Sequence, residues 1–196
     1  MAHRTGRWAA ALTALFLCTA EAQAPGASRA APERAKPCAA CHGADGNSVL
    51  PGIPSIAGQP KVFIENLLVL TREGLRGSPT MQTLMHGVKD AEIRELAAYF
   101  SALPARSTPG PLDKPMFERG RALAAKMHCG NCHRPDYAGQ AQMPRLAAQR
   151  EDFLNDILRS YRDSPPPGSD TMMASVLYRV PDADLRALAH YMAHLK

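Results

Sequence analysis

The chain has 196 residues and a formal net charge of +5, from 23 Lys and Arg against 18 Asp and Glu. The basic residues are interspersed with acidic ones instead of forming a basic stretch, which argues against a nucleic-acid-binding protein. We therefore expect a surface of mixed charge and no nucleic acid among the partners.

The first 22 residues have the composition of a secretory signal peptide. Arg4 and Arg7 give a charged start, residues 8–20 form an apolar run, and a small-residue cleavage site ends at Ala22. The run is too short to span a bilayer comfortably. We therefore predict a cleaved signal at residues 1–22 and a mature protein in the periplasm.

A pattern of two cysteines separated by two residues, with a histidine directly after, occurs twice. Its residues are Cys38, Cys41 and His42, and then Cys129, Cys132 and His133. This is the attachment sequence of a c-type haem, in which each thiol adds to one vinyl group of the porphyrin and the imidazole binds the iron. We therefore predict two covalently bound haem c groups, attached through the four cysteines, with the two histidines as axial ligands.

Other uses of paired cysteines fit this chain less well. A four-thiolate zinc cage needs no trailing histidine, and Cys41 and Cys129 are much further apart than the ligands of a zinc ribbon. A thioredoxin-like redox pair belongs in a βαβ setting, and no strand pattern surrounds either motif. Disulfides suit an exported protein, but they leave both histidines unexplained.

The first motif is followed by two stretches with apolar residues at helical spacing. Residues 62–70 follow Pro60, with Gly74 as a plausible end, and residues 93–103 form the second stretch. Acidic residues precede the second stretch, where a helix dipole favours them. Both stretches are predicted to be core helices.

The second half repeats the first after a segment rich in proline. Residues 103–111 are helix-breaking and read as a linker, and helical spacing returns at residues 153–161 and 185–195. We therefore predict an all-α fold of two small tandem domains joined by a Pro-rich linker. The expected domains span residues 23–104 and 105–196, with one haem in each.

The second axial ligand is expected to be a methionine, because a thioether closes the iron and suits electron transfer. Each half offers several methionines: Met81 and Met85, and then Met172, Met173 and the more distant Met143. Met81 and Met173 both lie 12 residues before matching apolar positions of the last helix in their half. The repeat therefore selects Met81 and Met173, which we expect to lie in loops.

Two further pairs of residues match between the halves. The carbonyl groups of Pro54 and Pro144, which follow the haem motifs, are reasonable acceptors for the Nδ1 protons of the histidines. Arg72 and Arg162 match at an offset of 90 residues. Either arginine is a candidate partner for a haem propionate, although a solvated helix residue is the more common outcome.

Residues 38–48, 54–59 and 90–99, together with Met81, closely resemble the dihaem class I cytochromes c of the cytochrome c4 type. The resemblance extends from about Pro37 to the C-terminus. It implies an all-α fold of two tandem class I cytochrome c domains, two His/Met haems packed near a pseudo-twofold axis, and soluble periplasmic electron transfer to a terminal oxidase or reductase. It also supports Pro54 and Pro144 as partners of the ligating histidines. In this family a helix containing a glycine crosses the last helix, and Gly120 with Tyr191 fits that pattern.

The haem motifs point to one of three functions. The leading prediction is an electron carrier, not an enzyme, that shuttles single electrons between a respiratory donor and a membrane oxidase or reductase, with peripheral membrane association. The alternative is a dihaem cytochrome subunit of a periplasmic flavin- or quinone-dependent dehydrogenase. A haem peroxidase needs an open or displaceable sixth position on the iron, against which Met81 and Met173 argue.

Overall fold

The computed structural model describes residue 1 and residues 30–106 and 109–196. Regular structure within these ranges is helical, apart from one isolated bridge between Gln140 and Met143. The all-α prediction is therefore confirmed. Residues 2–22 of the predicted signal peptide lie outside the described residues. Among the described helices, none has both the length and the apolar composition that crossing a bilayer requires.

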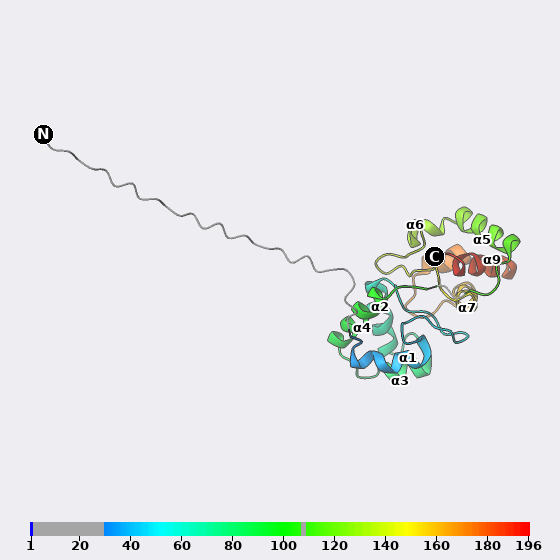
Figure 1. Ribbon diagram of the computed structural model, residues 1–196. Helices are drawn as coiled ribbons and strands as arrows, with labels where there is room; N and C mark the ends of the chain where they lie inside the picture. Colours follow the sequence, from blue (N-terminus) through cyan, green and yellow to red (C-terminus); the bar gives the residue numbers. More distant parts are fainter. Residues whose placement is uncertain (2–29, 107–108) are drawn as a thin grey trace.

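The first half begins with a short 3₁₀ turn and continues with helices (Figure 1). In chain order these elements are η1 (Glu33–Ala35), α1 (Lys36–His42), α2 (Lys61–Arg72), α3 (Pro79–Met85) and α4 (Asp90–Ala102). Helices α2 and α4 confirm the two helices predicted from apolar spacing. Gly74 lies just after α2 and has a φ of 72°. This left-handed conformation ends a helix, and glycine adopts it without strain.

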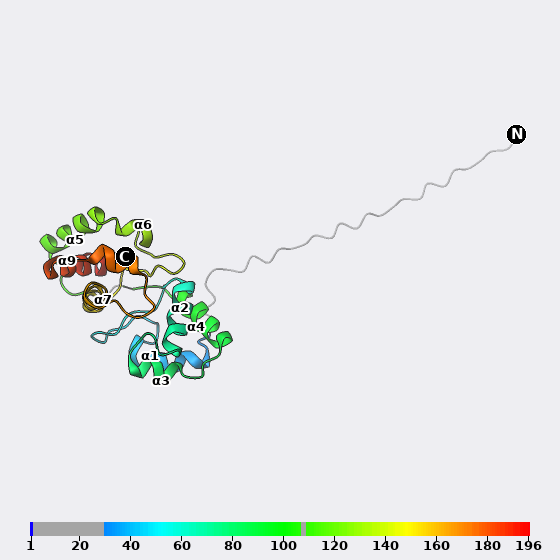
Figure 2. The same cartoon turned by 180° about the vertical axis from the view of Figure 1, so that it is seen from behind.

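The second half has the same order of elements after a longer opening helix (Figure 2). Its helices are α5 (Lys114–Lys126), α6 (Cys129–His133), α7 (Glu151–Asp163), α8 (Thr171–Leu177) and α9 (Asp182–Ala193). Helices α7 and α9 confirm the two predicted in this half. Asp182 and Asp184 occupy the first turn of α9, where the N-terminal end of the helix dipole favours negative charge.

Helices α5 and α9 lie side by side and pack closely at Gly120 (Figure 1). A Cβ atom at Gly120 would lie 2.6 Å from the Cβ of Tyr191 and would also overlap the carbonyl oxygen of Ala187. The two backbones can therefore approach this closely only because residue 120 has no side chain. The expected contact between Gly120 and Tyr191 is confirmed.

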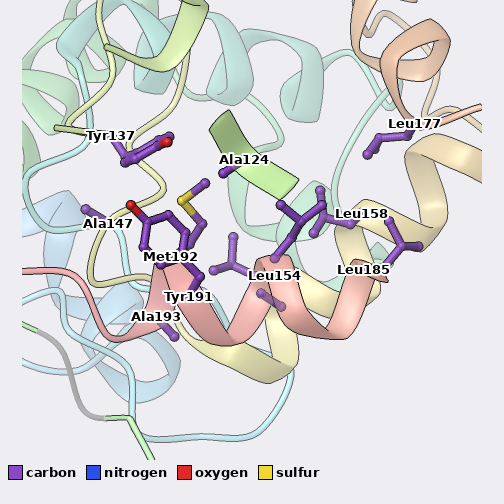
Figure 3. Close-up of a cluster of buried hydrophobic side chains, with 12 residues drawn as sticks. Ala124, Tyr137, Ala147, Leu154, Leu158, Leu177, Leu185, Tyr191, Met192 and Ala193 are labelled. Atoms are coloured by element: carbon purple, nitrogen blue, oxygen red, sulfur yellow. The ribbon is translucent and has the colours of Figure 1, made fainter. Parts of the chain in front are cut away.

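The two halves bury their apolar side chains differently. The second half has one continuous cluster in which side chains of α7 and α9 meet Ala124 of α5 and Tyr137 (Figure 3). In the first half the buried side chains form two separate clusters. One contains Ala35, Ile64, Leu96, Ala97 and Phe100, and the other contains Met85, Val88 and Ile93. The protein core of the first half is thus the less continuous of the two.

The segment that joins α4 to α5 is fastened to the first half at its beginning. The Asn47 side chain donates from Nδ2 to the carbonyl of Pro104 (3.1 Å) and accepts at Oδ1 from the N–H of Arg106 (2.8 Å). Asn47 is itself buried, so these bonds satisfy polar atoms that would otherwise lose water. Residues 104–106 therefore pack with the first half.

Candidate haem sites

The first motif forms the short helix α1. Cys38 is half-buried and Cys41 is exposed, and both are free thiols. Burial raises the pKa of the Cys38 thiol above its ordinary value, so the thiol is neutral at physiological pH. Gly43 ends the helix at a φ of 85°. The chain then turns so that the loop after the motif returns toward His42.

His42 is buried, and one of its ring nitrogens is already held. Its Nδ1 lies 2.8 Å from the carbonyl oxygen of Pro54. A carbonyl can only accept, so Nδ1 carries the proton and Nε2 has the lone pair that a metal needs. Burial also lowers the pKa of the imidazole, which favours its neutral form.

The same arrangement recurs in the second motif. The Nδ1 of His133 lies 2.8 Å from the carbonyl oxygen of Pro144, and burial again lowers the pKa of the imidazole. Both histidines are 7% exposed. The sequence repeat is therefore also a repeat of hydrogen-bond geometry.

The methionines selected from the repeat lie in helices, so the prediction that they lie in loops is wrong. Met81 is in α3, whose N-terminus is capped by the Ser78 hydroxyl, and Met173 is in α8, capped by the Asp170 carboxylate. These caps satisfy free N–H groups at the helix starts and stabilise helices of only seven residues each.

The competing methionines have different surroundings. Met85 is buried with Val88 and Ile93 and fills the core. Met172 is 62% exposed, whereas its neighbour Met173 is partly buried against the core of the second half. The burial of its side chain therefore favours Met173 over Met172 as a ligand, in agreement with the repeat.

The side chains of Arg72 and Arg162 hydrogen-bond to the protein itself. The sequence had made both arginines candidate partners of a haem propionate. Nη1 of Arg72 donates to the carbonyl of Val88 at 3.0 Å and also to Asp90. Nη1 of Arg162 donates to the carbonyl of Val180 at 2.7 Å. Each arginine thus ties the end of α2 or α7 to the chain just before the closing helix.

The residues present fit a covalently attached haem in each half. The thiols of both motifs are unpaired and both histidines retain an unprotonated Nε2. The Nε atom of Arg145, the residue after Pro144, is buried without a hydrogen-bond partner. A buried cationic donor of this kind calls for an acidic acceptor, and a haem carries propionates.

One other cluster has metal-binding residue types, but its nitrogen atoms are in use. In the described residues, Glu151, His190 and His194 bring their ligand atoms within 4.8 Å of one another. His190 contacts the Glu151 carboxylate through Nδ1 and accepts from the N–H of Asp113 through Nε2. Both ring nitrogens of His194 face backbone carbonyls. This cluster therefore fastens α9 to α7 and to the start of α5.

Two buried glutamines make contacts that the sequence pattern does not predict. Gln59 and Gln149 match at an offset of 90 residues, the same offset as Pro54 and Pro144. Their correspondence was visible in the repeat, but no local pattern indicated that each binds the opposite half.

Comparison with known proteins identifies the family. The model described as "Cytochrome c" matches residues 117–196, and the model described as "Cytochrome C oxidase, cbb3-type, subunit III" matches residues 27–100. A cytochrome c4 of Thiocapsa roseopersicina is 32% identical over 81% of this chain and 86% of the relative. The chain belongs to the cytochrome c4 family. A cytochrome c4 of Azotobacter vinelandii is 30% identical over 90% of this chain and 93% of the relative.

Solved cytochrome c4 structures agree with this assignment. The reduced recombinant cytochrome c4 of Pseudomonas stutzeri matches with a TM-score of 0.74 and 26% identity, covering 83% of this chain and 95% of that one. The match confirms the prediction of two tandem cytochrome c domains. As a cytochrome c4, the chain is an electron-transfer protein with two covalently bound haem c groups, and it interacts with redox partner proteins.

Proposed function

We propose that this cytochrome c4 is a periplasmic carrier that shuttles single electrons between a respiratory donor and a terminal oxidase or reductase. The observation that carries the proposal is the duplicated histidine geometry, with Nδ1 held 2.8 Å from a proline carbonyl in each half. Fixing the tautomer and the ring orientation prepares Nε2 as a ligand before any metal arrives. Two such sites in one chain hold two electrons.

The proposed ligand sets follow the two motifs. Cys38 and Cys41 attach the first haem, and His42 and Met81 are its axial ligands. Cys129 and Cys132 attach the second haem, and His133 and Met173 are its axial ligands. Pro54 and Pro144 hold the histidines. When bound, an iron closed by histidine and methionine supplies reversible one-electron chemistry and no open coordination position.

Covalent attachment is tested directly. Acid–acetone extraction should leave the haem on the protein, and the intact mass should exceed that of the polypeptide by two haem groups. The protein must be made in a strain that can mature c-type cytochromes. A colourless product containing zinc would contradict the proposed attachment.

We also propose that residues 1–22 form a signal that is removed on export, and that the domains meet near residue 104. The hydrogen bonds that Asn47 makes with Pro104 and Arg106 support an end of the first domain close to this position. Mass analysis of the mature protein should give an N-terminus at Gln23. Retention of the first 22 residues would contradict the signal.

The carrier proposal is tested with haem-loaded protein reduced by ascorbate. Membranes from the native organism should oxidise it rapidly, and the rate should saturate with cytochrome concentration and fall with an oxidase inhibitor. Partial sedimentation with the membranes at low salt would support the proposed peripheral association. Failure of the membranes to oxidise the cytochrome would contradict the carrier.

A second candidate is a cytochrome that accepts electrons from a dehydrogenase. The "Thiosulfate dehydrogenase electron acceptor" of Thiomonas intermedia is 29% identical over 87% of this chain and 83% of that protein. The thiosulfate dehydrogenase TsdBA structure from Marichromatium purpuratum matches with a TM-score of 0.70 and 27% identity, although this chain covers only 36% of it. Reduction of the cytochrome by native periplasmic extract only when thiosulfate is added would favour this candidate.

A further inference from the structure

Two glutamines reach across the contact between the halves and bind the main chain of the opposite half. The Oε1 of Gln149 accepts from the N–H of Ser55 at 2.8 Å, and its Nε2 donates to the Ser55 carbonyl at 2.8 Å. The Oε1 of Gln59 accepts from the N–H of Arg145 at 2.9 Å, and its Nε2 donates to the Arg145 carbonyl at 3.0 Å. Gln59 and Gln149 are only 5% and 6% exposed.

The two contacts are reciprocal. Gln59 and Gln149 occupy matching positions of the repeat, and so do Ser55 and Arg145, with an offset of 90 residues in both cases. Each half therefore makes the same pair of hydrogen bonds to the other, as across the interface of a twofold-symmetric dimer. We call these two contacts the glutamine clamps.

Each clamp ends on the peptide group that holds a haem-site histidine. The peptide bond between Pro54 and Ser55 presents its carbonyl to Nδ1 of His42 and its N–H to Oε1 of Gln149. The peptide bond between Pro144 and Arg145 does the same for His133 and Gln59. A continuous hydrogen-bonded chain thus runs from each histidine into the opposite half.

Hydrogen bonds in such a chain affect one another. A bond accepted from the N–H of a peptide polarises the peptide and makes its carbonyl a better acceptor. A stronger acceptor at Nδ1 raises the basicity of the imidazole at Nε2. A more basic ligand favours ferric over ferrous iron, and hydrogen bonding beyond the ligand is one of the ways in which a protein sets a haem potential.

We propose that Gln59 and Gln149 are positioning residues that tune the haem of the opposite half. Gln149 acts on the first haem through Ser55, Pro54 and His42, and Gln59 acts on the second haem through Arg145, Pro144 and His133. This inference rests on the proposed ligation by His42 and His133. It assigns the contact between the domains a role in setting potentials in addition to holding the halves together.

The test compares Gln149→Met with Gln59→Met in the haem-loaded full chain. Methionine has a similar length but neither accepts nor donates as the amide does. Redox titration is followed by NMR of haem methyl resonances assigned to each half. Gln149→Met should raise the potential of the first haem only, and Gln59→Met that of the second haem only.

With cooperative gains of about 10–30% per bond, we expect a change of about twofold in the ferric-to-ferrous ratio at fixed ambient potential. That ratio corresponds to about 18 mV, at 59 mV per tenfold for one electron.

Asp152→Asn is the control for a merely structural effect. It weakens a bond between the halves, from the N–H of Gly52 to the Asp152 carboxylate at 2.9 Å, without touching either clamped peptide. At high salt, which screens the lost surface charge, it should leave the difference between the two potentials unchanged. If the clamp variants instead shift the haem of their own half, or shift both haems alike, the proposal is overturned.

Gln149→Glu and Gln59→Glu keep the proposal testable if the methionine variants do not load haem. A carboxyl oxygen can still accept from the clamped N–H, so the potential of the opposite haem should stay at or below the wild-type value. A rise there would overturn the proposal. A wild-type spectrum without low-spin, histidine-ligated haem would overturn the ligand assignment and this proposal together. A normal wild-type spectrum with no effect of the clamp variants would overturn this proposal alone.

Discussion

Replacing Gly120 with alanine should destabilise the second domain, because no room exists for a side chain where α5 crosses α9. The added Cβ would lie 2.6 Å from the Tyr191 Cβ, whereas carbon atoms pack best at about 3.5–4.0 Å. The helices would therefore have to separate by about 1 Å. The other obstacle, the Ala187 carbonyl, is backbone and cannot rotate away.

The size of the effect follows from two opposing contributions. Overpacking a close-packed core costs about 1–3 kcal/mol, and we take the upper end because backbone must move. Alanine has a helix propensity better than that of glycine by about 1 kcal/mol. The net loss is therefore about 2 kcal/mol, or about 8–16 °C in Tm for a domain of this size.

The assay is thermal and urea unfolding of the haem-loaded protein, with Gly130→Ala as a matched control. Gly130 is also helical, but its added Cβ would meet nothing closer than Pro135 Cα at 3.4 Å, and Ala39 stands at this position in the first motif. The control should be neutral or stabilised by up to about 1 kcal/mol. Equal stability of Gly120→Ala and Gly130→Ala would refute the packing argument.

Three further predictions concern the haems and the contact between the halves. Met81→Ala and Met173→Ala should each remove about half of the sulfur-to-ferric-iron charge-transfer band, because each removes one of two equivalent bonds. Met172→Ala should leave the band intact. If Met172→Ala removes half of the band and Met173→Ala does not, the ligand is Met172. The two haems should titrate at different potentials, because the loops after His42 and His133 differ; a single Nernst curve with identical microscopic potentials would contradict this. The Arg150 side chain lowers the pKa of Asp152 to about 2 from an ordinary value of 3.8, so the stability contributed by this carboxylate is complete above the ordinary value and is lost as pH falls through about 2. Urea midpoints should therefore fall less over that pH range in Asp152→Asn than in wild type, and equal falls would refute the assignment.

The long helices and the two haem-attachment motifs could be recognised from the sequence. Helices α2, α4, α7 and α9 each have 12 or 13 residues, so their apolar spacing extends over three turns and is easily recognised. Helices α3 and α8 have seven residues each, too few for a clear period. Their capping residues, Ser78 and Asp170, are the available signal, together with Pro79, because proline is favoured in the first turn of a helix.

The glutamine clamps could not be predicted from local pattern, because they depend on how one half sits against the other. A buried glutamine in an irregular segment has no period, and its partners lie 94 or 86 residues away in the chain. The repeat shows only that Gln59 and Gln149 are equivalent. The packing of the halves determines which surface each glutamine faces. Both glutamines bind backbone groups, so the side chains of their partners carry no pattern that would indicate the contact.

That choice also explains how the interface keeps its symmetry while the two haem surroundings differ. Each clamp binds the N–H and carbonyl of its target, so the target's side chain is free to change. In the first half the target is Ser55, whose hydroxyl accepts from the N–H of Ser48 at 3.1 Å. In the second half it is Arg145, whose buried Nε has no protein partner. The residue that follows the histidine-binding proline is therefore neutral in the first half and carries a guanidinium in the second half. The proposed clamps therefore hold both histidines in the same geometry, and the residues that they bind provide a source for the predicted difference in potential between the haems.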